Sequence, residues 1–144
     1  QPSKQDGTMQ RILRVVASGA SQEVSVARPI DLTLLAWAFA TLVQRPRTLV
    51  LAVASEATQK IGEFTEQHIS NTTWAFAKLD VRYDPWLTAM IEETFTRLPH
   101  LSPQHVSNIV WALGRSMIKS EAKIGYDSWR LLSAMATLAG KRIE

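Results

Sequence analysis

The feature that most constrains this chain is a stretch of about a dozen residues that occurs three times. It reads DLTLLAWAFATL, then HISNTTWAFAKL, then HVSNIVWALGRS, and its tryptophans Trp37, Trp74 and Trp111 lie 37 residues apart. A fixed interval of roughly 20–50 residues is typical of stacked repeat arrays. A surface that binds a polymer uses the same residues several times over, whereas a catalytic site rarely does. We therefore expect tandem units that serve packing or polymer binding.

Apolar residues within each unit recur at steps of three and four, the spacing of one face of a helix. The β-branched residues follow the same steps rather than alternating, so no strand is predicted. Proline or an N-cap residue precedes several of these stretches, as expected at helix starts. We predict helices over residues 29–43, 47–64, 66–81, 85–98, 103–118 and 127–142. The fold class is all-α, an α-solenoid of tandem helical hairpins with about 37 residues per repeat.

The 144 residues suffice for one domain with its own hydrophobic core. The sequence begins with Gln1 rather than methionine and opens on a polar stretch, so we expect that a targeting segment has been removed or that the chain belongs to a longer protein. We divide the chain into a polar lead-in and a single α-solenoid domain, which has one leading helix and three repeats. The boundaries are 1–7 for the lead-in, 8–144 for the domain, 8–20 for the leading helix, and 28–64, 65–101 and 102–144 for the repeats.

Composition excludes several classes of function. Cysteine is absent, which rules out disulfide frameworks and thiolate metal sites. No apolar run approaches the roughly 20 residues that a transmembrane helix needs. The HExxH, phosphate-loop and nucleophile-elbow motifs do not occur. We predict no enzyme, no catalytic residue, no metal, no cofactor and no small-molecule substrate. The net charge of +3 and the pI near 9.5 permit a polyanionic partner.

Three positions shared by the units are predicted to pack in the core or between helices. Two are always apolar, and the third is always small, which would let a neighbouring helix approach closely. They are Leu32, Ile69 and Val106; Phe39, Phe76 and Leu113; and Ala40, Ala77 and Gly114. We interpret the three tryptophans as packing residues between units. The alternative is that they are stacking platforms for a ligand.

The last helix carries a second shared motif. YDSW, which begins at Tyr126, repeats YDPW, which begins at Tyr83, after the insertion KSEAKIG has lengthened the connection. By analogy with the preceding unit we predict that this helix faces the core through Trp129, Leu132, Met135 and Leu138.

Another set of shared positions follows the first helix of each unit at steps of three and four. In the second and third units these steps give His, Asn, a small residue and then two basic residues. Basic side chains suit phosphates, and asparagine can both donate to and accept from base edges. The alternative is a solvated face whose residues match because the repeats share an ancestor. The predicted RNA-binding residues are Arg45, His68, Asn71, Lys78, Arg82, His105, Asn108, Arg115 and Lys119.

The stretches SNTTWAFAKL and SNIVWALGRS resemble the octotricopeptide and heptatricopeptide type of helical repeat, which is related to repeats in RAP and FAST-kinase-like proteins. The resemblance covers about residues 28–143. Gly114 departs from the pattern in the third unit, and the first unit lacks the Ser and Asn. The resemblance implies an α-solenoid that binds single-stranded RNA in mitochondria or plastids, or that forms part of an organellar ribosome. These 144 residues include no RAP-like stretch, so the resemblance implies no nuclease activity.

Two functions therefore remain in competition. The first is a non-enzymatic RNA-binding protein of an organelle, which contacts single-stranded or ribosomal RNA through the basic stripe. The second is a scaffold subunit of a large organellar complex, either a ribosome or a membrane-associated assembly, which binds protein instead. Three units would accommodate only about three or four nucleotides at one base per repeat, and this favours the scaffold.

Overall fold

The computed structural model describes residues 18–20, 22–119 and 125–141, and every regular element among them is helical. The prediction of an all-α fold is confirmed for these residues. The predicted lead-in 1–7 and most of the predicted leading helix 8–20 lie outside them. The α-helices are α2 (Pro29–Thr41), α3 (Arg47–Gln59), α4 (Glu66–Lys78), α5 (Asp84–Arg97), α6 (Pro103–Lys119) and α7 (Tyr126–Lys141).

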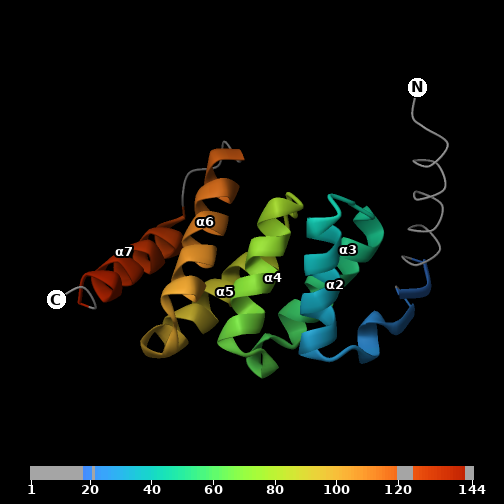
Figure 1. Cartoon of the computed structure of the whole chain (residues 1–144), viewed down its shortest axis with the longest axis horizontal. Helices are drawn as coiled ribbons and strands as arrows, with labels where there is room; N and C mark the ends of the chain where they lie inside the picture. Colours follow the sequence, from blue (N-terminus) through green and yellow to red (C-terminus); the bar gives the residue numbers. More distant parts are fainter. Residues whose placement is uncertain (1–17, 21, 120–124, 142–144) are drawn as a thin grey trace.

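The helices lie in two layers. Figure 1 shows α2, α4 and α6 side by side in one row, and these neighbours make the most extensive contacts in the molecule. Helices α3, α5 and α7 contact one another in sequence order and form the second layer. Consecutive helices of the chain pair across the layers, while residues about 37 positions apart meet within the layer of α2, α4 and α6.

A short 3₁₀ helix precedes the first helix of each unit. These helices, η1 (Val24–Val26), η2 (Ile61–Glu63) and η3 (Leu98–His100), begin 37 residues apart. The same interval separates the starts of α2, α4 and α6. The predicted helix 47–64 was too long, because α3 ends at Gln59 and Lys60 leads into η2. An internal Gly62 lowers helix propensity in that last stretch, which suits a separate turn.

The shared apolar positions lie in the core. Phe39, Phe76 and Leu113 are all buried, as are Leu32 and Ile69, which confirms the predicted core stripe at these residues. At the shared small position Ala40 and Ala77 are buried as well. Gly114 differs: a Cβ placed on it would meet no atom within 4 Å. The close helix approach predicted from this glycine is therefore absent.

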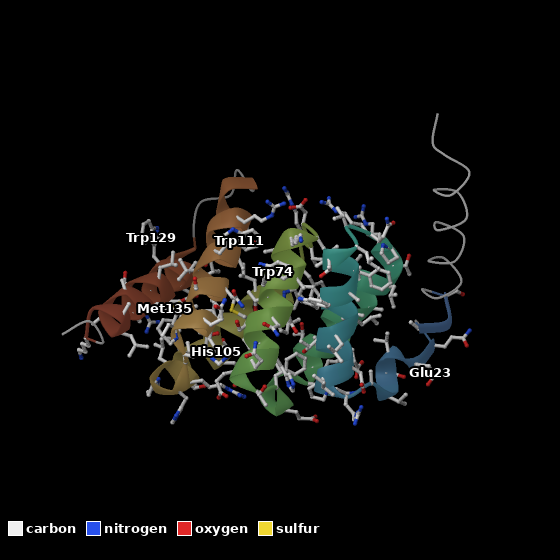
Figure 2. All side chains as sticks on the ribbon, viewed as in Figure 1. Glu23, Trp74, His105, Trp111, Trp129 and Met135 are labelled. Carbon is white, nitrogen blue, oxygen red and sulfur yellow. The ribbon has the colours of Figure 1, made fainter. Side chains whose placement is uncertain are left out.

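Helix α7 does not present the predicted face to the core. Trp129 is 56% exposed, whereas Ser128, Leu131 and Met135 are buried, so the helix is rotated relative to the face predicted from the YDSW motif. Figure 2 shows Trp129 and Met135 on this helix. Of the predicted inner residues, only Met135 is fully buried. The preceding unit's Trp86 is buried against Phe64 and Phe76, and Trp129 has no such role.

A basic side chain at the end of α3 and another at the end of α5 bind the carbonyl oxygens of the turn before the paired first helix. Lys60 Nζ donates to the Ser25 oxygen at 3.0 Å and the Ala27 oxygen at 2.9 Å. One unit later, Arg97 donates to the carbonyl oxygens of Gly62, at 3.4 Å, and of Phe64. All three residues of this second clamp lie 37 positions after their counterparts in the first. We call these contacts the carbonyl clamps.

Each carbonyl clamp also contains carboxylates. Glu56 lies 2.9 Å from Lys60 Nζ, and Glu93 lies 3.0 Å from Arg97 Nη2. Arg97 is also 3.5 Å from Glu66, the first residue of α4. Both cations are therefore neutralised where they are largely buried, which lowers the cost of removing them from water.

The first helices of units one and two end in the same left-handed turn. Val43 has φ 54° and Asp80 has φ 55°, and each amide donates back to the helix, to Ala40 and Ala77 respectively, in the Schellman pattern. Aspartate tolerates this conformation, whereas a β-branched valine adopts it only with backbone strain. Val43 is also 64% exposed, so little burial offsets the strain.

We expect Arg97→Met to lower the free energy of unfolding by about 2–3 kcal/mol, because it leaves Glu66 and Glu93 without their cation and two carbonyls without a donor. The exposed Arg47→Met, at the start of α3, serves as the control and should change stability by less than about 0.5 kcal/mol. Urea unfolding followed by circular dichroism measures both. Equal effects of the two substitutions would show that the clamp contributes nothing to stability.

We expect Val43→Asn to raise the free energy of unfolding by about 1 kcal/mol, since asparagine adopts the left-handed conformation at lower cost. Val26→Asn is a matched control at another exposed valine, which does not have positive φ. Thermal unfolding should show a higher midpoint for Val43→Asn alone. A decrease, or an equal change in both variants, would contradict the strain at Val43.

Candidate functional site

The predicted RNA-binding histidines start their helices. His68 Nδ1 accepts from the Thr65 amide at 3.3 Å, and Thr65 Oγ1 accepts from the His68 amide at 3.2 Å. His105 and Ser102 make the same two bonds, both at 3.2 Å. This is a reciprocal capping box with histidine in the place usually taken by glutamate or glutamine. The match between units is therefore explained by helix initiation, without a ligand.

The first unit fills the same position with Asp31. Its Oδ2 accepts from the Arg28 amide at 3.1 Å and from the Arg28 side chain at 2.8 Å. The side-chain hydrogen bond from Arg28 lowers the pKa of Asp31. Aspartate and histidine thus perform the same capping role at this position. This role explains why the histidine recurs, without any contact to RNA bases.

The asparagines connect neighbouring side chains. Asn71 Oδ1 accepts from Gln67 at 2.8 Å, and Asn108 Oδ1 accepts from Gln104 at 2.9 Å. Asn108 Nδ2 also donates to Ser70 Oγ at 3.1 Å, which joins α6 to α4. Both functional ends of Asn108 are therefore engaged within the protein.

The alanines of the predicted stripe are buried, so the stripe is not one exposed surface. Ala75 and Ala112 have exposed fractions of 0% and 1%. The accessible path along each first helix instead passes through the tryptophan one position earlier. We define the tryptophan face as the following residues of α2, α4 and α6: Leu34, Trp37, Thr41, Asn71, Trp74, Lys78, Asn108, Trp111 and Arg115.

The tryptophans combine packing with exposure. Trp74 is partly buried against the core, and its ring lies 6.1 Å from that of Trp111 at an interplanar angle of 33°. Figure 2 shows these two side chains on adjacent helices. Trp37 is nevertheless 47% exposed and Trp111 is 44% exposed. The interpretation as packing residues holds for the Trp74–Trp111 contact, but sequence reasoning missed the large aromatic area left open to solvent.

A cation stands over a tryptophan in two successive units. Lys78 Nζ lies 4.9 Å from the Trp74 ring centroid, and the Arg115 guanidinium lies 5.6 Å from that of Trp111. Each cation follows its tryptophan by four residues, one helical turn later. The spacing was visible in the sequence as W-x-x-x-K and W-x-x-x-R and could have revealed the pairing.

The remaining predicted basic residues lie at the carboxyl ends of the first helices. Arg45 Nη1 is 3.0 Å from Asp80 Oδ2, and Arg115 Nη2 is 3.5 Å from Asp80 Oδ1. Arg82 is exposed just after α4. Lys119 is the last residue of α6, and its side chain lies outside what the structure describes. Asp80 was not predicted, because its partners come from the two flanking units.

Comparison of the chain with protein-family models, with curated proteins and with solved structures finds no match. Within the described part of the chain, no helix is both long and apolar enough to span a membrane. The same residues contain no cluster of three or more histidine, aspartate or glutamate side chains placed to hold a metal ion.

Burial lowers the pKa of His68, so the folded state favours the neutral ring, whose Nδ1 accepts the Thr65 amide. The unfolded chain binds the proton more readily, so this part of the stability is complete above the ordinary pKa near 6.5 and is lost as the pH falls below it. His68→Gln keeps a capping acceptor without titrating. We expect it to match the wild type at pH 8 and to be the more stable protein near about pH 5.5.

Urea unfolding at several pH values measures this difference, and the same substitution serves as its own control at high pH. A stability difference between His68→Gln and the wild type that does not change with pH would contradict the assigned role of the neutral ring.

Proposed function

We propose that this chain is a non-enzymatic RNA-binding protein whose tryptophan face holds single-stranded RNA. The observation that carries the proposal is the pair of tryptophan–cation contacts at equivalent positions of α4 and α6. Proteins that bind single strands combine aromatic platforms, on which bases stack, with cations that track the phosphates. The tryptophan face presents both kinds of group on adjacent helices.

An α-solenoid architecture supports this proposal. The 37-residue interval between helix starts and the two equivalent carbonyl clamps fit units that share one design. In a solenoid each unit contacts its neighbours, so equivalent side chains form a continuous row. Such a row suits a polymer whose chemical groups also repeat.

The structure changes which residues we assign to RNA. Trp37, Trp74 and Trp111 supply the stacking area, and Lys78 and Arg115 supply positive charge beside it. His68 and His105 are capping residues, and Asn108 is engaged by Ser70 and Gln104. We therefore propose binding that depends on stacking and charge and reads little sequence, as is usual for stacking platforms.

The resemblance to octotricopeptide-type repeats supports the same proposal. It would place the protein in a mitochondrion or plastid, bound to single-stranded or ribosomal RNA. The proposal rests first on the tryptophan face and only then on this resemblance.

A protein-binding scaffold is the second candidate, and exposed apolar side chains favour it. Leu34, Leu42, Val43 and Trp129 are each more than half exposed. Exposed apolar patches commonly mark protein interfaces. Crosslinking of the protein in its native setting distinguishes the two functions, because the tryptophan face would be attached to RNA in one case and to protein in the other.

We expect Trp37→Ala to weaken binding to a short fluorescent oligouridylate by about 1–3 kcal/mol, the usual effect of losing one stacking platform. Lys78→Glu should weaken binding and flatten its dependence on salt. Trp129→Ala removes an equally exposed tryptophan from α7, outside the tryptophan face, and should leave affinity unchanged. Anisotropy titrations measure all three. Equal losses from Trp37→Ala and Trp129→Ala would reject the assigned face.

A further inference from the structure

One carboxylate lies between two arginines at the edge of the tryptophan face. Arg45 follows α2, Asp80 follows α4, and Arg115 belongs to α6, so three successive units contribute. Each Asp80 oxygen is approached by a different arginine, Oδ2 by Arg45 at 3.0 Å and Oδ1 by Arg115 at 3.5 Å. Among the described residues, ion pairs thus join two arginines to this one carboxylate.

The turn at Asp80 does not itself require a carboxylate. Val43 occupies the equivalent position after α2 and adopts the same left-handed conformation without any charge. The left-handed backbone therefore favours aspartate or asparagine at this position but does not require the negative charge. The Asp80 carboxylate contacts both arginines and so holds their side chains close to each other.

All three side chains remain accessible to a ligand. The side chain of Arg45 is 51% exposed, that of Arg115 is 32% exposed and that of Asp80 is 22% exposed. Ion pairs with this degree of solvent contact are weak. A phosphate group offers more charge and more acceptor oxygens than a carboxylate, and arginine binds it with favourable geometry. A phosphate can therefore replace Asp80 between the arginines at small cost.

We infer that Arg45 and Arg115 form a phosphate-binding site, which the Asp80 carboxylate occupies while the protein is unbound. The inference deepens the proposed RNA function and rests on it for the identity of the ligand, a phosphodiester of single-stranded RNA. Free inorganic phosphate shares this chemistry, so the experiment must separate the two.

The position of Arg115 connects this site to the stacking area. Its guanidinium lies over the Trp111 ring, and its Nε donates to the Ala77 carbonyl oxygen at 3.0 Å. That hydrogen bond fixes the arginine at the carboxyl end of α4, where the helix dipole also favours a cation. A phosphate bound here would lie beside a base stacked on Trp111, so one nucleotide of a single strand could use both groups.

The decisive variant is Asp80→Asn, since asparagine tolerates the left-handed conformation and removes only the competing charge. Glu92→Gln is the matched control: it changes net charge by the same amount at an exposed position on α5. Arg45→Met combined with Asp80→Asn removes the proposed ligand contact. Arg115 is left intact in every variant because it also bonds to Ala77.

The first measurement uses inorganic phosphate alone, at constant ionic strength. Phosphate in several-fold excess over its dissociation constant should raise the melting temperature of Asp80→Asn by about 2–4 °C. The wild type, Glu92→Gln and the double variant should show much smaller shifts. Identical shifts in Asp80→Asn and Glu92→Gln would overturn the site.

The second measurement uses the oligouridylate. Asp80→Asn should bind it several-fold more tightly than the wild type, with a salt dependence steeper by about 0.7 for each added phosphate contact. A phosphate response without any RNA binding would support the site and reject the RNA function. RNA binding by the wild type that Asp80→Asn leaves unchanged or weakens would support the RNA function and overturn the site.

Discussion

The arrangement of the helices depends on hydrogen-bond donors for the carbonyl groups that lie just before α2 and α4. A partly buried carbonyl, such as that of Ala27 or Phe64, destabilises a fold when it has no donor, and the helix that follows begins too late to supply one. Lys60 and Arg97 supply the missing donors from the ends of α3 and α5. An ammonium group and a guanidinium group reach equivalent oxygens, so the constraint concerns the position of a cation rather than its shape. By fixing where α2 and α4 begin, the clamps also fix where their tryptophans lie.

The same reasoning separates two causes of the similarity between units. Asp31, His68 and His105 agree in role rather than in residue type, because each accepts a hydrogen bond from the N-cap amide. Similarity of this kind needs no ligand. Trp37 and Trp111 are different, because nearly half of each indole contributes to no packing in the described structure. Large exposed aromatic area at equivalent positions is the part of the similarity that packing and capping within the described structure do not explain.

Helix positions could be predicted from the sequence because their signals are local. Pro29, Thr65 and Ser102 mark the starts of the first helices, and the three-and-four spacing of apolar residues identifies the core side. The rotation of α7 could not be predicted from YDSW, because a four-residue motif does not specify how the helix packs against α5, α6 and η3. As a result of this rotation, Ser128 is buried and Trp129 is exposed.

The candidate site was harder to predict than the helices. The capping role of His68 could in principle be predicted from the sequence, since Thr65 precedes it by three residues, as in a capping box. The role of Asp80 could not be predicted from the sequence, since its partners Arg45 and Arg115 lie 35 residues away on either side. The exposure of Trp37 depends on which elements pack around α2, and the spacing of residues in the sequence does not predict these neighbours.

The distribution of charge matters more here than the net charge of +3. Lys60 and Arg97 are committed to carbonyl oxygens and to Glu56, Glu66 and Glu93, so they contribute little to the field outside the molecule. At the edge of the tryptophan face, by contrast, the ion pairs of the described residues join two arginines to one carboxylate. A polyanion is attracted by charge that is locally uncompensated, because screening limits the reach of more distant charges to about 10 Å. Arg45 and Arg115 lie at the edge of the face that carries the exposed indoles, so the proposal combines base stacking on these rings with phosphate binding by the two arginines.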